Sequence, residues 1–212
     1  MRDRREYTGV KIMPAVVEMH PAQLPLGTRR KYTREDCRVL EAAGRLDLER
    51  YELIDGELIR KVPKSRLHTI VLKLLLKWLR GEFGEPTVEH GVPIDLSRNL
   101  DATNEPEPDA IVLRRTTGKF PSVNPGPADL LLVLEVAVTT RDYDLGAKAA
   151  LYAKAGIVDY WVLDLVAMQI VVHRNPVGDR YESIVAYFVD EPVAPLAAEG
   201  AFVCLRDLVS AD

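Results

Sequence analysis

The stretch ADLLLVLEVAVTTRDYDLGAKAALYAKAGIVDYWVLD, residues 128–164, decides the fold. It begins with an apolar run, residues 130–138, which a single acid, Glu135, interrupts. A polar loop follows, then a segment of helical character that carries Lys148, and then a second apolar run at residues 160–163. This order predicts strand, helix and strand, with an acid inside the first strand and a lysine on the helix.

Glu135 needs a partner, because removing an unpaired charge from water costs on the order of several kcal/mol. Upstream, Asp109 follows a proline and opens another apolar run. If the two strands are neighbours, their carboxylates repel each other unless a cation lies between them, and hard oxygen donors suit Mg²⁺ or Mn²⁺. Lys148 could orient or deprotonate a metal-bound water. Three simpler interpretations stay open: an internal salt bridge between Glu135 and Lys148, an Asp109 that only caps its strand, and a solvated Lys148.

The composition is that of a globular protein. Of 212 residues, 47% are hydrophobic and 28% are charged, which is enough to build a full core. No apolar run approaches the roughly 20 residues of a membrane span, and the charged N-terminus lacks the apolar segment of a secretory signal. Cys37 and Cys204 have no metal-ligand spacing. We expect a cytoplasmic protein with reduced cysteines. The net charge of −4 argues against a nonspecific DNA coat but allows an enzyme with a basic rim.

The remaining segments predict a mixture of helices and strands. Residues 1–28 contain three prolines without a clear period, so we expect an arm there, followed by a single domain over residues 29–212. Thr33 and Ser65 are candidate helix caps. The expected helices are 33–44, 66–81 and 205–209, and the expected strands are 51–62 (a hairpin around Asp55-Gly56), 87–90, 92–96, 108–114, 168–174, 180–189 and 202–204. This order predicts an α/β (α+β) fold in which helices flank a central mixed β-sheet.

An ordered set of residues spread over about residues 32–208 resembles one known family. The set consists of Glu52, Asp55-Gly56-Glu57, His68, Pro108-Asp109, Glu135, Asp144, Lys148, Tyr152, Gly156, Tyr160-Trp161 and Asp164. It resembles the Uma-type endonucleases, a bacterial branch of the restriction-endonuclease-like, PD-(D/E)xK superfamily. The resemblance implies the superfamily's central sheet, a site that uses Mg²⁺ (or Mn²⁺), a DNA substrate and a homodimer.

The same resemblance implies roles for four residues. Asp109 and Glu135 would be metal ligands, and Lys148 would be the catalytic lysine, moved from the strand to the adjoining helix. Glu57, in the hairpin, matches an acid that often completes the site as a further ligand. The superfamily motif places its lysine two residues after the glutamate, where this chain has Ala137.

Several further residues have two interpretations. We expect Glu52 to be structural, His68 to cap or pack its helix, and Tyr160-Trp161 to lie in the core rather than to stack on a base. The basic residues could form solvated faces, and the second of their three clusters, which follows the hairpin, could instead line a groove for phosphates. They lie in three clusters: Arg29-Arg30-Lys31; Arg60-Lys61 with Lys64 and Arg66; and Arg114-Arg115 with Lys119.

The leading functional hypothesis is a Mg²⁺-dependent endodeoxyribonuclease. The alternative is a nucleic-acid or protein-binding module that keeps the fold but has weakened catalysis, which Ala137, Val138 and the acidic net charge favour. A hydrolase of small phosphate compounds is the third possibility.

Overall fold

The computed structural model describes residues 31–97, 100–116 and 123–209. The expected arm at residues 1–28 lies outside this part of the chain, and so do the basic residues Arg29, Arg30 and Lys119. Among the described residues, no helix is long and apolar enough to cross a membrane.

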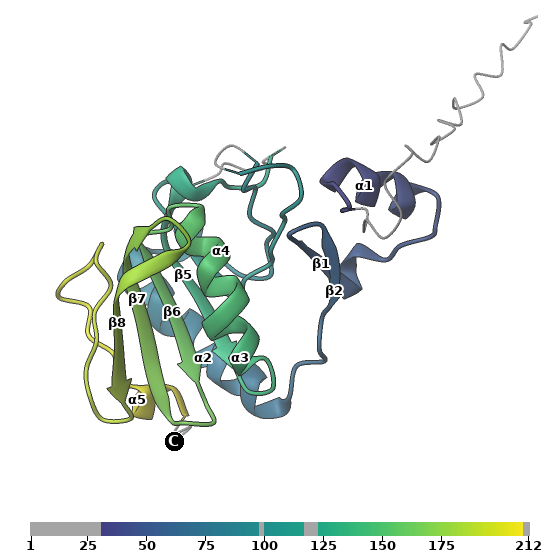
Figure 1. The fold of residues 1–212 in the computed structure, drawn as a ribbon. Helices are drawn as coiled ribbons and strands as arrows, with labels where there is room; N and C mark the ends of the chain where they lie inside the picture. Colours follow the sequence, from purple (N-terminus) through teal and green to yellow (C-terminus); the bar gives the residue numbers. More distant parts are fainter. Residues whose placement is uncertain (1–30, 98–99, 117–122, 210–212) are drawn as a thin grey trace, which may run out of the picture. The chain divides into compact units, whose positions relative to one another are not determined.

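A six-stranded mixed sheet forms the centre of the described domain (Figure 1), as the sequence predicts. The strand order is β3-β4-β5-β6-β7-β8; β5 and β6 pair in parallel and the other neighbours are antiparallel. The strands are β3 (Val88–Glu89), β4 (Ala110–Leu113), β5 (Leu130–Ala137), β6 (Asp159–Asp164), β7 (Gln169–Val177) and β8 (Arg180–Phe188). A separate hairpin pairs β1 (Tyr51–Ile54) with β2 (Glu57–Arg60).

Helices cover both faces of the main sheet (Figure 1). One face packs against α2 (Arg66–Phe83) and α5 (Leu205–Val209), and the other packs against α4 (Ala149–Lys154). The remaining helical segments are α1 (Arg34–Ala42), α3 (Arg141–Tyr143), the π-helical η4 (Asp144–Lys148), and the short 3₁₀ turns η1 (Leu48–Arg50), η2 (Glu85–Thr87) and η3 (Pro127–Asp129).

Strand β5 divides its side chains between these two cores. Leu132, Leu134 and Val136 pack in the core that contains α2, whereas Val133 and Ala137 pack in the core that contains α4. Because successive side chains of a strand point to opposite faces, Glu135 lies on the α4 face, the side from which the helical segment approaches.

The structure confirms the two helix caps that the sequence predicts. Thr33 and Asp36 form a reciprocal capping box at the start of α1. The Ser65 side chain accepts a hydrogen bond from the backbone N–H of His68 at 3.2 Å and begins α2. In the hairpin turn, Asp55 and Gly56 have φ angles of 48° and 74°, the left-handed conformation that a tight two-residue turn requires.

Two expected strands are wrong. Ile94 and Leu96 are buried as the pattern predicts, but the N–H of Ile94 donates to Pro106 and that of Asp95 to Pro125, so loop carbonyls replace a neighbouring strand. The expected strand at residues 202–204 contributes a single bridge, from Val203 to Val193. Apolar patterning therefore identified burial there, but not the hydrogen-bond partner.

Candidate active site

Strands β4 and β5 bring Asp109 and Glu135 together. Asp109 directly precedes β4, and the register that pairs Ala110 with Leu134 places it opposite Glu135. The backbone N–H of Asp109 donates to Glu135 Oε2 at 3.2 Å, and Asp109 Oδ2 accepts the N–H of Val136 at 2.8 Å. The Asp109 side chain thus continues the ladder just before β4 begins. Both carboxylates are buried, so the prediction that they approach each other is confirmed.

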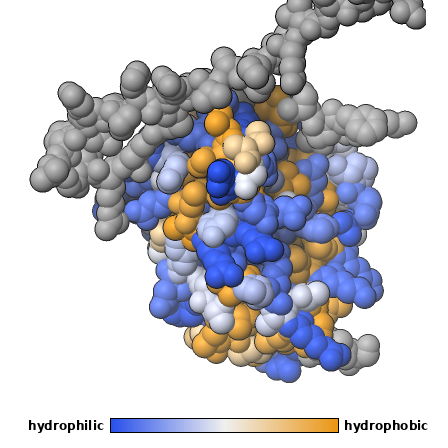
Figure 2. All heavy atoms as spheres, turned by 90° about the vertical axis from the view of Figure 1, so that its right-hand side faces the viewer, coloured by the Kyte–Doolittle hydropathy of each residue, from blue (hydrophilic) through white to orange (hydrophobic). Residues whose placement is uncertain are grey.

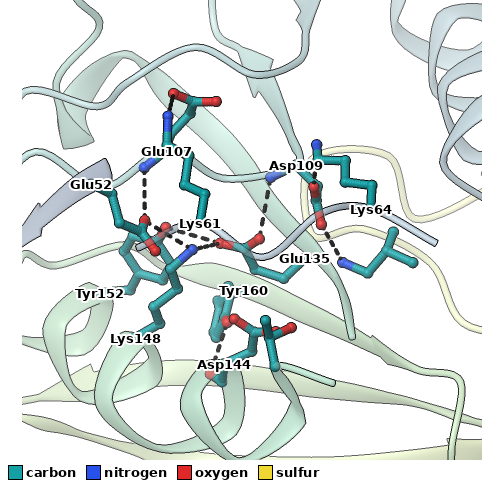
Figure 3. Close-up of polar contacts among 12 residues, drawn as sticks. Glu52, Lys61, Lys64, Glu107, Asp109, Glu135, Asp144, Lys148, Tyr152 and Tyr160 are labelled. Atoms are coloured by element: carbon teal, nitrogen blue, oxygen red, sulfur yellow. Dashed lines mark hydrogen bonds and ion pairs between the residues drawn. The ribbon is translucent and has the colours of Figure 1, made fainter. Parts of the chain in front are cut away.

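Lys148 joins this pair from the helical segment. Its Nζ lies 2.9 Å from Glu135 Oε1 and 3.1 Å from Glu52 Oε2, and its side chain is only 6% exposed (Figure 3). The Tyr152 hydroxyl, one turn further on, donates to the same Glu135 oxygen at 3.3 Å. The ammonium of Lys148 is therefore held between two buried carboxylates, and the solvated alternative for this residue is excluded.

The ammonium beside Glu135 comes from Lys148 on the helical segment, whereas position 137 of β5 is an alanine. Ala137 lies on the same face of β5 as Glu135, is fully buried, and packs in the core that contains α4. A small residue there leaves the space beside Glu135 to the helical segment. The salt bridge between Glu135 and Lys148, one of the simpler interpretations, is present. Glu135 therefore pairs with Lys148 and lies next to Asp109 at the same time.

The β1–β2 hairpin contributes Glu52 rather than Glu57 to this cluster. Glu52 contacts Lys148, accepts the N–H of Glu107 at 3.3 Å, and lines the same pocket as Asp109. Glu57 is exposed and lies outside the residues that line this pocket. The site proposed below therefore uses Glu52 in place of Glu57. The sequence placed both acids in the hairpin, but which one faces the sheet depends on how the hairpin packs.

The first turn of α2 and the segment just before it supply two cationic or hydrogen-bonding partners to Asp109. His68 Nε2 lies 3.0 Å from Asp109 Oδ2, and Lys64 Nζ lies 2.8 Å from Asp109 Oδ1 (Figure 3 labels Lys64). The expectation that His68 only caps or packs was incomplete. The signal that could have found both residues is the basic segment just before a capped core helix, but its closeness to the start of β4 is a tertiary fact.

These groups line one pocket with a volume of about 350 Å³. Its walls come from residues 59–65, from the end of β5 with the following threonines, and from the helical segment that carries Asp144 and Lys148. Figure 2 shows the side of the molecule on which Figure 1 draws the β1–β2 hairpin; hydrophilic residues cover much of the centre of this face. Tyr160 and Trp161 are fully buried in the sheet. Their expected core placement is therefore confirmed, and they cannot stack on a base.

Burial and charge perturb the acids of this cluster in opposite directions. Burial favours the protonated form of Asp109, but the hydrogen bond from His68 and the charges of His68 and Lys64 outweigh it and hold the pKa of Asp109 well below its usual range. Burial raises the pKa of Glu135, and the neighbouring carboxylates raise it further. The charge of Lys148 lowers this pKa but only partly offsets the increase. Burial likewise raises the pKa of Asp144 to about 6, against the opposing charge of Lys148 and a hydrogen bond from Thr140.

Burial and the neighbouring carboxylates also shift the pKa of Lys148, each in the direction opposite to its effect on an acid. Burial alone would lower the pKa of its ammonium, but the carboxylates of Glu135, Glu52 and Asp144 outweigh that effect and raise the pKa. Lys148 is therefore held in its charged form.

The cluster has an excess of negative charge when its acids are ionised. Counted without His68, its four carboxylates outnumber its two ammonium groups by two; the groups are Glu52, Asp109, Glu135, Asp144, Lys64 and Lys148. Protonation of Glu135 or Asp144 can relieve part of this excess, and one divalent cation would balance all of it. Burial is the largest cause of the raised pKa of both acids, and the neighbouring carboxylates add to it.

The donor set suits a hard divalent ion that keeps part of its water shell. Among the described residues, no three His, Cys, Asp or Glu side chains are grouped so that they could hold a metal ion alone. Mg²⁺ does not require such a group, because proteins commonly bind it through one or two carboxylates together with waters and substrate phosphates. Asp109 and Glu135 supply two such carboxylates at one end of two adjacent strands.

Comparison with known proteins identifies the family. A family model described as "Uma2: Putative restriction endonuclease" matches residues 35–203. This match covers most of the chain, so the protein belongs to this family, as its resemblance indicated. None of the curated proteins compared with the chain matches it.

The crystal structure of a "putative nuclease belonging to DUF820" from Anabaena variabilis is similar, with a TM-score of 0.62 and 15% sequence identity. The similarity covers 80% of this chain and 96% of that chain. At this identity the likeness shows a shared fold.

Proposed function

We propose that this protein is a divalent-metal-dependent endonuclease that hydrolyses phosphodiester bonds of DNA. The observation that carries the proposal is the juxtaposition of Asp109 and Glu135 across β4 and β5, with the Lys148 ammonium on Glu135. Membership of a family described as restriction endonucleases supports the same reaction class. An acid pair beside a buried cation on one rigid sheet is an arrangement suited to phosphoryl transfer.

Asp109 and Glu135 would hold Mg²⁺ or Mn²⁺ in this proposal. When bound, such an ion polarises a phosphoryl oxygen and makes a coordinated water more acidic. Glu52 would act through Lys148 rather than as a metal ligand, because its carboxylate contacts Lys148 and the N–H of Glu107. Its role would be to fix the ammonium in place and keep it charged.

Lys148 would act as a donor of hydrogen bonds and positive charge rather than as a base. Its raised pKa means that the ammonium does not release a proton near neutral pH, so it cannot take one from water. A fixed ammonium between Glu135 and Glu52 can orient the attacking water and stabilise the negative charge that develops on the phosphate. Of the two roles considered from the sequence, the geometry supports orientation.

Basic residues on the pocket wall would contact the DNA backbone. Arg60, Lys61 and Lys64 line the pocket, and Lys61 pairs with Glu107 there. Contacts of this kind position a duplex through its phosphates without reading its sequence. They also make binding salt-dependent, because each neutralised phosphate releases condensed counterions.

Cleavage of supercoiled plasmid DNA tests the proposal and its choice of residues. The parent should nick the plasmid with Mg²⁺ or Mn²⁺ and not with excess chelator, and Asp109→Asn and Glu135→Gln should lose this activity. Glu52→Gln should reduce it about 100-fold or more, as removal of one positioned polar group typically does, whereas Glu57→Gln serves as the matched hairpin control and should stay near the parent. Equal activity of the parent and Asp109→Asn contradicts the assignment.

One observation favours a second candidate, a nucleic-acid-binding module without turnover. The described residues contain no group of three potential metal ligands, and Lys148 already neutralises part of the acid pair. Such a module would bind duplex DNA equally well with and without divalent ions and would never nick it. The expected homodimer stays a prediction, which the mass of the protein in solution tests.

A further inference from the structure

Lys64 contacts the one oxygen of Asp109 that the folded core does not use. Asp109 Oδ2 has two partners, the N–H of Val136 at 2.8 Å and His68 Nε2 at 3.0 Å. Oδ1 lies 2.8 Å from Lys64 Nζ and, within the described part of the chain, contacts no other polar group. Oδ1 is therefore the oxygen of Asp109 at which a cation can bind, and the Lys64 ammonium is the group that such a cation meets there.

Lys64 is also the cation of the cluster that can leave most easily. Its side chain is 49% exposed, compared with 6% for Lys148 and 11% for Asp109. It directly precedes the helix cap Ser65 and lies in neither a helix nor a strand. A lysine on a flexible four-carbon stem can move without disturbing the core, and an ion pair that is half open to water holds weakly.

Contacts from α2 and β5 hold the Asp109 side chain independently of Lys64. The His68 ring sits on α2, and the Val136 N–H belongs to β5, so both contacts to Oδ2 come from the rigid frame of the domain. Asp109 can therefore exchange its partner at Oδ1 without rotating. Lys64 would remain on the wall of the same pocket, where a DNA phosphate would lie.

We propose that Lys64 occupies the metal position of Asp109 until a divalent ion arrives and then moves to a phosphate of the bound DNA. The inference rests on the proposed function and deepens it by stating when Lys64 becomes available to the substrate. A divalent ion brings more positive charge than the ammonium it displaces, so it repels Lys64 from the acid pair. Metal binding thereby makes one more cation available to the substrate.

Titration calorimetry with Mn²⁺ in the absence of DNA tests the first half. Lys64→Met removes the competitor, so the Kd for Mn²⁺ should fall about two- to fivefold, the factor that corresponds to a partly exposed ion pair. Lys64→Arg retains the charge and should behave like the parent. Arg60→Met removes one positive charge from the same pocket wall without touching Asp109, and should change the Kd by less than Lys64→Met does.

The salt dependence of DNA binding tests the second half. With Ca²⁺ present, the slope of log K against log salt concentration should be smaller in Lys64→Met than in the parent by about 0.9, the value of one phosphate contact. Without divalent ions the two slopes should agree, because Lys64 is then engaged with Asp109. Arg60→Met should change the slope by the same amount under both conditions.

The outcomes distinguish failure of the proposed role of Lys64 from failure of the proposed metal-dependent function. If the parent binds no Mn²⁺, the metal-dependent function itself fails and the role of Lys64 fails with it. If the parent binds Mn²⁺ and Lys64→Met binds it with the same Kd, the site stands and the proposed competition is wrong. A slope difference between the parent and Lys64→Met that persists without divalent ions contradicts the proposed transfer to phosphate.

Discussion

The Lys148 ammonium lies 2.9 Å from Glu135 Oε1 although the two residues belong to different elements, the helical segment η4 and strand β5. Lys148 is thus the partner that Glu135, an acid inside an apolar strand, needs. This pairing also places a fixed cation beside Glu135, which itself accepts the backbone N–H of Asp109, without a lysine on the strand itself. The same contact is therefore both a stabilising feature and the proposed source of transition-state charge.

Removal of Lys148 should destabilise the fold as well as reduce activity. Lys148→Met leaves Glu135 and Glu52 buried without their cation, which should lower the free energy of unfolding by about 3 to 5 kcal/mol. The double variant Lys148→Met/Glu135→Gln should lose less than the sum of the two single variants, because it removes both ends of the pair. Urea denaturation measures all three. Strict additivity would show that the two side chains are not coupled.

The stability of the parent should decrease between about pH 4 and pH 6 relative to Asp144→Asn. The pKa of Asp144 is raised from 3.8 to about 6 in the folded state. The folded state keeps this proton where the unfolded state has released it, so stability falls as pH rises through that interval, by at most about 3 kcal/mol. Denaturation at about pH 4.5 and pH 7.5 checks the sign. A difference between the variants that does not change with pH contradicts the assigned pKa.

Two tyrosines near the pocket should respond differently to loss of the hydroxyl. The Tyr160 hydroxyl donates to the carbonyl of Asp144 at 2.9 Å, so Tyr160→Phe should cost about 1 kcal/mol of stability. The Tyr143 hydroxyl is buried without a hydrogen-bond partner among the described residues. Tyr143→Phe should therefore be neutral or slightly stabilising. Thermal unfolding of both variants compares them directly, and an equal loss in both would show that the Tyr143 hydroxyl has a hydrogen-bond partner.

Much of the fold followed from the sequence because its local signals agree with the tertiary structure. The cap at Ser65 and the apolar run around Glu135 predicted α2 and β5, and the Asp55-Gly56 turn predicted the hairpin. The expectation that Asp109 and Glu135 meet needed one further assumption, that their strands are neighbours, and β4 and β5 are.

The rest of the site depended on packing that no local pattern encodes. Glu52 and Glu57 belong to the same hairpin, and only its orientation against the sheet decides that Glu52 reaches Lys148. His68 and Lys64 reach Asp109 because the start of α2 lies beside the start of β4, elements that are far apart in the chain. The segment at residues 92–96 has the apolar pattern of a strand, but its N–H groups bind loop carbonyls.

Mn²⁺ titration by calorimetry of the parent and Asp109→Asn tests the central claim most directly. The substitution preserves the shape of the side chain and removes the charge that an ion between Asp109 and Glu135 needs. The account predicts one divalent site in the parent and its loss in Asp109→Asn, while circular dichroism shows that the variant remains folded. Absence of binding in the parent, or binding of equal affinity in the folded variant, would contradict it.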